Sequence, residues 1–401
     1  MTSKPTSTNP YGRAARDKFE ALKQAYASND TGQQVSFWKL GNSFDTMIDF
    51  LDTIDDSSAH DVAQMAVTQL AASLEHIEGG YDGAWFDDFG WWSVATQRAL
   101  QKPFFQPDAE QIQNILDQCW PRFTNNAPFV WQRHKPGTFE DYGPAVDGGV
   151  WNAYWDGTPD KYPGPKTGDP SNGNLIGIQN TVTNALYLMA AHRLGHADPD
   201  ARQAAQKELH FLFTWFDEKE DPLWWAFDEN TALVRERVGH FAKGVRGPRC
   251  DGPPCWNCAG FQENWAWTGD QGLILGDLND ALLDLAPGFR APFLIRAKQL
   301  LSGVRQHLVD GSGVVQSYTT TGCIPDGDEP DYQTGPGVFW RNALYVWKTN
   351  PDLRTFLASQ EYQAMVRASA NAAAKAPTDG QPIETLTNHT AVLVAATAML
   401  E

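Results

Sequence analysis

Helical periodicity runs through nearly the whole chain, and it is the feature that most constrains the fold. In residues 60–77, apolar residues recur every three or four positions, as they do on the buried face of an amphipathic helix. The same pattern predicts about twelve helices, at 11–28, 41–53, 60–77, 87–101, 108–121, 177–194, 198–216, 269–286, 291–308, 336–348, 351–374 and 385–400. Strand patterns are weak, and only 232–238 and 313–318 are expected to form short hairpin pieces.

Three long segments rich in Gly, Pro and aromatic residues interrupt the helices, at 122–176, 218–268 and 309–335. Loops of this length inside a compact domain are usually functional, and these contain many tryptophans, so we expect them to be ordered. No Pro/Ser-rich linker divides the chain. We therefore predict a mobile arm at 1–9 and a single domain at 10–401.

Twelve helices in one domain suggest six helical hairpins closed into a ring, an all-α (α/α)6 barrel with short β-hairpins around its cleft. Inner helices would alternate with outer ones, and the starts of the inner helices would converge on a cleft built by the long loops. A plain helical bundle and a solenoid are the alternatives. No fixed-period repeat is visible in the sequence, which disfavours the solenoid.

Two adjacent carboxylates, Asp87 and Asp88, lie within an unusually aromatic segment, YDGAWFDDFGWW at 81–92. Aromatic faces stack on sugar rings, and a pair of carboxyl groups is the usual equipment for cutting a glycosidic bond. Two like charges held close cannot both ionise easily, so the pKa of one rises while the other stays low. The structural alternative is capping, because acidic residues are favoured at the start of a helix.

The charge and composition narrow the class of partner. The formal net charge of −18 argues against nucleic acid or an anionic membrane, because both bind basic surfaces, and it suits a neutral glycan. No apolar run approaches the length of a membrane span. The N-terminus lacks the apolar stretch of a secretory signal, so we expect either a cytoplasmic protein or a secreted one without its leader. The composition does not set an oligomeric state.

The cysteines and histidines do not predict a metal site. Cys250, Cys255 and Cys258 cluster in CDGPPCWNC, but a zinc site would need a fourth ligand such as His240, and the paired spacing is absent. We expect a local disulfide or free thiols there. The nine histidines show no metal-binding spacing, and the sequence has no HExxH motif, phosphate-binding Gly loop or nucleophile elbow. We therefore expect neither a metal nor another cofactor.

Several stretches together resemble glycoside hydrolase family 76, the endo-α-1,6-mannanases, whose fold is an (α/α)6 barrel. The most specific is FDDFGWWSVATQRA, an Asp-Asp segment followed by Trp-Trp. The others are FWKLGNSFDTMIDFL, GGVWNAYW, IQNTVTNALYLMAAHRL, GDQGLILGDLNDAL and GPGVFWRNALYV, so the resemblance spans residues 37 to about 350. The chain departs from the family at Gly335-Pro336-Gly337, where typical members have Lys-Gly, and in its long loops at 154–174 and 244–260.

The resemblance implies that Asp87 is the nucleophile and Asp88 the general acid/base of a retaining glycosidase or transglycosidase, with α-1,6-mannan as the first expected substrate. The helix dipole agrees with this order, because Asp87 lies nearer the helix N-terminus and would stay ionised. Asp88, beside an anion and among aromatic rings, would hold its proton.

Further residues are candidates for contacts with the sugar. Asn180 and Asn184 lie four apart on one helix face, where their amides could bind adjacent hydroxyl groups or pack between helices. Asp270 is either a ligand or a helix cap, and the tryptophans are either stacking platforms or core residues. The complete set of predicted substrate-binding residues is Trp38, Asn42, Trp92, Trp151, Asn180, Asn184, Trp265, Asp270 and Gln271.

Three other functions remain open from the sequence. A sugar epimerase or isomerase could use the same barrel, although that chemistry usually needs facing histidines. A non-catalytic glycan-binding protein would keep the cleft without the reaction. A polysaccharide lyase would need a basic subsite for uronates, for which the cluster from Arg235 to Arg249 is the candidate.

Overall fold

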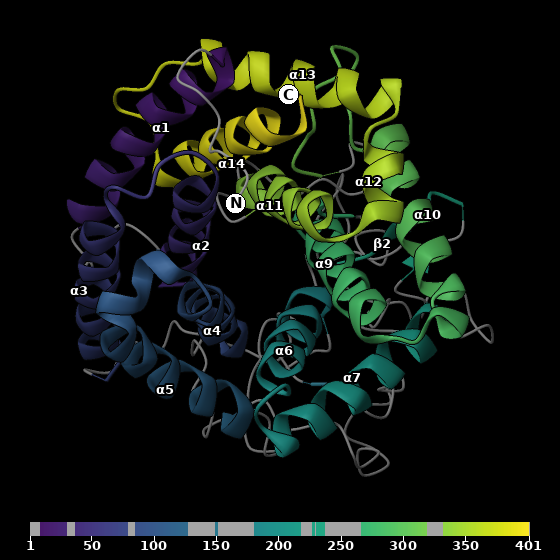
Figure 1. The fold of residues 1–401 in the computed structure, drawn as a ribbon, viewed down its shortest axis with the longest axis horizontal. Coiled ribbons are helices and arrows are strands. Elements are labelled where there is room, and N and C mark those ends of the chain that lie inside the picture. Colours follow the sequence, from purple (N-terminus) through teal and green to yellow (C-terminus); the bar gives the residue numbers. More distant parts are fainter. Residues whose placement is uncertain are drawn as a thin grey trace, which may run out of the picture.

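The computed structural model describes residues 9–29, 37–78, 85–126, 149–150, 180–217, 227–228, 230–236, 266–318 and 332–400. These residues form two concentric layers of helices around a central axis (Figure 1). The inner layer contains α2 (Phe37–Thr53), α4 (Phe86–Leu100), α6 (Thr181–Leu194), α9 (Thr268–Asp284), α11 (Gly335–Thr349) and α14 (Ile383–Met399). The outer layer contains α1 (Pro10–Ala27), α3 (Ala59–Glu78), α5 (Ala109–Asn126), α7 (Pro199–Asp217), α10 (Ala291–His307), α12 (Pro351–Leu357) and α13 (Gln360–Lys375).

The inner layer is a closed ring. Each inner helix packs against the next one along the chain, and α14 packs against α2 to complete the circle. The outer helices pack against this ring, for example α1 on α14, α5 on α4 and α7 on α6. The predicted all-α (α/α)6 barrel is therefore confirmed. Inner helices such as α6 and α14 contact neighbours on every side, which is why their apolar residues extend around the helix rather than along one stripe.

Helix α2 begins four residues before its predicted start, at Phe37, and α6 begins four residues after its predicted start, at Thr181. Two larger differences from the prediction concern 351–374 and the end of α5. The segment 351–374 divides into α12 and α13 at Ser359, which lies in an extended conformation and begins the second helix. The break lets α12 pack on α10 and α11 while α13 packs on α1 and α14, so the outer layer follows the curve of the ring. Helix α5 continues past Pro121 to Asn126, where we had expected a loop, and its Phe123 is buried.

Strand structure in the described residues is limited to short pieces. β1 (Phe227–Asp228) pairs antiparallel with β2 (Leu233–Val234), which falls inside the predicted 232–238 segment. In the predicted 313–318 segment the structure has only isolated bridges, Val309 with Val315 and Trp267 with Tyr318. Short 3-10 helices occupy Pro103–Asp108, Pro287–Phe289 and Tyr332–Thr334.

The two ends of the ring are built differently. Connections from an inner helix to the next outer one are short, such as 195–198 between α6 and α7. Connections from an outer helix to the next inner one include all three long segments predicted as loops, which lie mostly outside the described residues. The C-terminal ends of α2, α4, α6, α9 and α11 surround one shared cavity, so their N-terminal ends meet at the opposite end. The described residues at which the long connections leave the outer helices and enter the inner ones therefore lie at the N-terminal mouth, the end of the ring where the inner helices begin.

The N-terminus of the described chain is fixed by a helix cap. The side chain of Asn9 accepts hydrogen bonds from the backbone N–H groups of Tyr11, at 2.9 Å, and Gly12. The rest of the predicted 1–9 arm lies outside the described residues, and the single domain at 10–401 stays a prediction. Among the described residues, no helix is both long enough and apolar enough to cross a membrane.

Candidate active site

Helix α4 places Asp87 on the face that looks toward the ring axis. Trp91, Val94 and Arg98 of this helix line a small cavity of about 10 Å³ on the axis. Asp87 precedes Trp91 by four residues and therefore continues the same stripe by one helical turn toward the N-terminal mouth. The side chain is half-buried. Asp87 therefore lies on the axial stripe of α4, at the N-terminal end of the helix.

Asp88 lies on a different face of the same helix, rotated by about 100° from Asp87. Its side chain is buried, and its Oδ2 accepts a hydrogen bond from the backbone N–H of Trp85 at 3.0 Å. This bond is half of a capping box, so the capping role considered from the sequence is present in the structure. The two carboxyl groups are therefore held at the first turn of α4, on adjoining faces.

The two tryptophans of α4 are both buried, and their rings point in different directions. The Trp91 ring lines the axial cavity and lies 5.5 Å from the ring of Trp38, at an interplanar angle of 31°. Trp92, which we predicted to contact sugar, is fully buried. It packs against Phe37 and Phe44 and donates its indole N–H to the carbonyl of Phe37 at 3.0 Å. We correct the assignment: Trp92 joins α4 to α2, and Trp91 is the ring on the axis.

Asn42 is buried in the interior of the ring, where it binds another side chain. Its Oδ1 and its backbone carbonyl both accept hydrogen bonds from Nη1 of Arg341 on α11, at 2.5 and 2.6 Å. The amide of Asn42 therefore helps to hold α2 against α11.

Trp38 remains a candidate stacking platform at the N-terminal mouth. It lies seven residues before Asp45 on the same axial stripe of α2, and it is only partly buried.

The two asparagines of α6 have structural partners. Asn180 is the N-cap of the helix, and its Oδ1 accepts the backbone N–H of Thr183 at 3.2 Å. Asn184 accepts the N–H of Val150 at 2.8 Å and donates to the carbonyl of Asn180 at 2.7 Å. Residues Leu186 and Met189 mark the axial face of this helix, and Asn184 lies away from it. Asn184 therefore fastens Val150 to α6, and Asn180 caps the helix.

The start of α9 contains the remaining predicted residues. Gln271 exchanges hydrogen bonds with the backbone of Val234, at 2.8 and 2.7 Å, and so fixes β2 above the ring. Asp270 is fully buried in the first turn and lies one turn before Leu273, which lines the axial cavity. Trp151 and Trp265 lie outside the described residues.

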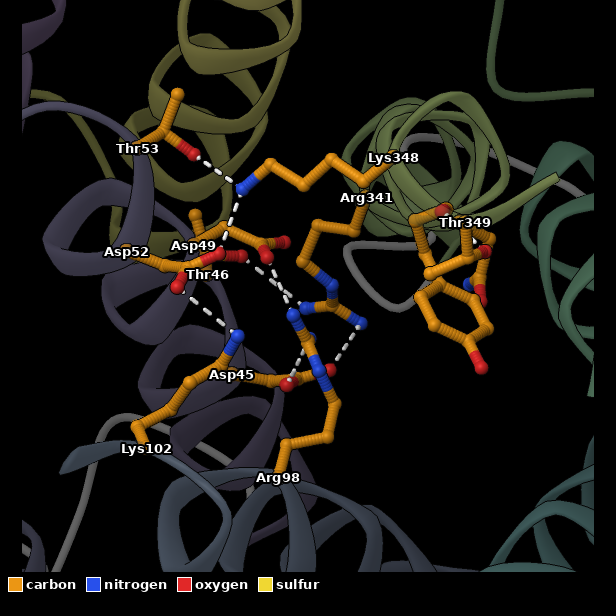
Figure 2. A network of polar contacts seen from close by, with 12 residues as sticks. Asp45, Thr46, Asp49, Asp52, Thr53, Arg98, Lys102, Arg341, Lys348 and Thr349 are labelled. Atoms are coloured by element: carbon orange, nitrogen blue, oxygen red, sulfur yellow. Dashed lines mark hydrogen bonds and ion pairs between the residues drawn. The ribbon is translucent and has the colours of Figure 1, made fainter. Parts of the chain in front are cut away.

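A charged network that we did not predict from the sequence lies inside the ring, between the two mouths (Figure 2). Arg98 of α4 forms ion pairs with Asp45 and Asp49 of α2, and Arg341 of α11 also pairs with Asp45, at 3.3 Å. Burial acts to raise the pKa of Asp45, but the guanidinium groups of Arg98 and Arg341 outweigh it and hold the pKa below its usual value. The network links three inner helices across the axis.

A second ion cluster continues toward the C-terminal mouth. Asp52 pairs with Lys348 at 2.6 Å and with Lys102 at 3.0 Å, and Lys348 also donates to the hydroxyl of Thr53 (Figure 2). Burial acts to raise the pKa of Asp52, and the two ammonium groups lower it to about 2. The only sequence pattern that could have indicated these two clusters is the spacing of Asp45, Asp49 and Asp52, which places them on one helix face.

The thiol chemistry of the described residues is limited to Cys119. It is buried and free, and burial raises its pKa far above the ordinary value. The cluster of Cys250, Cys255 and Cys258 lies outside the described residues, so the expected disulfide or free thiols there stay predictions.

The fold and the mouth together define a helical toroid with an acidic pair at the start of one inner helix. No protein-family model and no curated relative matches the chain. Solved structures do. One is an inactive variant of an α-1,6-mannanase of family GH76 from Salegentibacter sp. HEL1_6, with Asp-to-Asn changes at two adjacent positions, in complex with α-1,6-mannotriose. Its TM-score is 0.63 at 15% sequence identity, covering 98% of this chain and 100% of that one.

Two further neighbours share the fold. Dfg5 from Chaetomium thermophilum, in complex with glucosamine, has a TM-score of 0.63 at 16% identity and covers 99% of this chain and 92% of its own. A GH76 α-mannanase from Bacteroides thetaiotaomicron has a TM-score of 0.53 at 11% identity, covering 98% and 96% of the two chains. At these identities the likeness establishes the fold.

Proposed function

We propose that this protein is a retaining glycoside hydrolase of the GH76 type that cleaves α-linked mannan, with Asp87 as nucleophile and Asp88 as general acid/base. The observation that carries the proposal is the placement of Asp87 and Asp88 at the first turn of α4. Asp87 continues the axial stripe of α4 at the N-terminal mouth of the ring. The fold neighbour that was inactivated by changing two adjacent aspartates to asparagine supports the same pair.

The proposed reaction has two steps. In the first, the Asp87 carboxylate attacks the anomeric carbon while Asp88 gives its proton to the departing glycosidic oxygen, which leaves a glycosyl ester on Asp87. In the second, Asp88 takes a proton from water, the water oxygen attacks the anomeric carbon, and the ester bond to Asp87 breaks. Two inversions at one carbon retain the α configuration. Trp38, which is only partly buried, would stack on a sugar ring near this carbon.

Asparagine substitutions separate the chemistry from capping, because an amide oxygen can still accept the Trp85 N–H but cannot act as acid or nucleophile. On α-1,6-mannan, Asp87→Asn and Asp88→Asn should each lower kcat by about 100-fold or more, the size of a lost acid–base contribution. Asp61→Asn is the matched control, because Asp61 is an exposed acid in the first turn of outer helix α3. Full activity in both variants, with the wild type active, would contradict the proposed roles.

The identity of the acceptor distinguishes hydrolase from transglycosidase. In water enriched in oxygen-18, hydrolysis places one heavy oxygen in the new reducing end, whereas transfer to a second mannooligosaccharide gives a longer product without it. Mass spectrometry of the products reads both outcomes. The same experiment also separates cleavage from epimerisation and from binding alone, since neither of those changes chain length.

A further inference from the structure

The C-terminal mouth of the ring contains a second polar cavity, on the opposite side from the acidic pair. It has a volume of about 360 Å³ and is lined by residues from the last turns of five inner helices and the connections that follow them. Three of these residues, His192, His196 and Asp284, each place a ligand atom within 4.8 Å of the other two. The proposed glycosidase reaction uses none of them.

We propose that His192, His196 and Asp284 bind one divalent transition-metal ion, of which Zn²⁺ is the natural test case. Two imidazoles and one carboxylate are a ligand set that suits zinc, and they do not suit Ca²⁺ or Mg²⁺, which prefer all-oxygen sites. The site would join the end of α6 to the end of α9. It was not expected from the sequence, because one ligand comes from a helix about ninety residues further along the chain.

One ligand-atom distance is already close to that of a bound site, and the others are within 4.8 Å. His192 Nε2 lies 3.0 Å from Asp284 Oδ2, and the two imidazole rings are 5.7 Å apart between centroids and almost perpendicular. Tetrahedral zinc with bonds of about 2.0–2.1 Å holds its ligand atoms about 3.3 Å apart. His196 and Asp284 are exposed, so small side-chain rotations can close the remaining gap.

The backbone that presents His196 is held in place. Arg202 of α7 donates from Nε to the carbonyl of Gly195 at 2.9 Å, and the N–H groups of Ala197 and Asp198 donate to the carbonyl of Leu194, at 2.9 and 3.0 Å. The turn after α6 is therefore closed on itself and fastened to the outer layer. A fixed backbone lowers the ordering cost of binding a metal at its side chain.

Asp284 is available to bind a metal because the cationic side chains around the cavity pair with other acids. The neighbouring acids Asp52 and Asp280 are paired with Lys348 and Arg193, at 2.6 and 3.0 Å. Within the described residues, Asp284 contacts His192 and no lysine or arginine. A metal would supply the missing positive charge. With three protein ligands and a cavity alongside, the fourth position would be open to water or to an anion.

The test is Zn²⁺ titration by isothermal calorimetry of the full chain, stripped with a chelator, in a Cys250→Ser/Cys255→Ser/Cys258→Ser background that removes competing thiols. We expect one Zn²⁺ per chain. Both His196→Gln and Asp284→Asn should weaken binding by about 100-fold or more, because losing even a hydrogen-bonding partner of a metal ligand costs about 10- to 100-fold. Zn²⁺ should also raise the thermal midpoint of the parent and not of the variants.

His307→Gln is the matched control, since His307 is an exposed histidine at the end of outer helix α10. It should leave the affinity unchanged. Circular dichroism verifies that each variant is folded. Absence of saturable binding in the parent, or equal affinity in the parent and His196→Gln, would overturn the proposal, and neither result depends on whether the protein cleaves mannan.

Discussion

Single charged residues join the inner helices of this ring. Arg98 is 15% exposed and pairs with Asp45 and Asp49, which are 7% and 4% exposed. Burying such a group is costly, and the cost is offset only while every partner is present. Arg98 therefore contributes to stability mainly by neutralising two carboxylates that would otherwise be buried without it.

Replacing Arg98 by methionine should lower the free energy of unfolding by about 3–5 kcal/mol, because Asp45 and Asp49 would lose their shared partner inside the ring. Lys102→Met is the matched control: Lys102 and its partner Asp52 are each 25% exposed, and the loss should be about 1 kcal/mol or less. Urea unfolding measures both. An equal loss of unfolding free energy in the two variants would show that the buried Arg98 pairs contribute no more than the more exposed Lys102 pair.

At the residue scale, the sequence could locate the acidic pair, but it could not show which face of α4 is directed toward the ring axis. Adjacent residues of a helix point about 100° apart, so Trp91 and Trp92 cannot share one face, but the sequence could not decide which ring faced the axis. That choice depends on α2, whose Gly41 lies against the Trp92 ring and makes room for it. The contact between Asn42 and Arg341 was also invisible, because the two residues are 299 positions apart.

At the scale of elements, α9 and α11 pack unusually closely because α9 has glycine where they meet. A Cβ atom on Gly272 would lie 2.6 Å from the Cα of Phe339, and one on Gly276 would lie 2.4 Å from the side-chain oxygen of Asn342. Backbone cannot move aside as a side chain can, so Gly272 is the more restrictive position.

The substitution Gly272→Ala should therefore lower the free energy of unfolding by about 1–3 kcal/mol, the cost of overpacking a rigid contact. Gly288→Ala is the control, because no heavy atom lies within 4 Å of its added Cβ. Chemical denaturation of the two variants gives the comparison. A Gly272→Ala protein as stable as the wild type would mean that α9 and α11 can separate without cost.

Most elements could be predicted from periodicity, and the exceptions have physical causes. The pattern over 351–374 reads as one helix because apolar residues continue through it. The break at Ser359 arises from the curvature of the outer layer, which local periodicity does not encode. Likewise, Pro121 ended the predicted fifth helix, while burial of Phe123 against Tyr187 accompanies its continuation by another turn.

For the whole molecule, the balance of buried acids sets the pH dependence of stability. Glu208 is fully buried in α7, and neither carboxyl oxygen has a hydrogen-bond partner among the described residues. Burial raises its pKa well above 4.5. Burial also raises the pKa of Asp277, with Asp280 adding to the shift. The folded state therefore keeps protons that the unfolded chain releases, so stability falls as pH rises above the ordinary carboxyl range.

Glu208→Gln should reduce the decrease in unfolding free energy that accompanies rising pH. Near pH 4 the variant and the wild type should be similar, and at pH 8 the variant should be the more stable, since each retained proton steepens the decline by up to about 1.4 kcal/mol per pH unit. Glu361→Gln, at an exposed position in the first turn of α13, should leave the curve unchanged. Urea unfolding across the pH range gives the answer, and identical curves for the wild type and Glu208→Gln would refute the argument.

The closed ring could be predicted because the chain shows twelve helices without a linker and because several of its segments resemble glycoside hydrolase family 76; the helix pattern alone left a plain bundle open. What the sequence could not supply was the join between α14 and α2, which brings residues over three hundred positions apart into contact, as in the hydrogen bond of Ser43 with Thr387. The C-terminal cavity was hidden for the same reason, since it exists only when five helix ends meet.

The most direct test of the account is to trap the sugar on the protein. A fluorinated α-1,6-mannobiosyl fluoride that forms the glycosyl ester quickly and releases it slowly should add one disaccharide to each chain, and peptide mapping by mass spectrometry should locate it on Asp87. An adduct on any other residue, or none while mannan is being cleaved, would contradict the claim that Asp87 attacks the anomeric carbon at the N-terminal mouth of the ring.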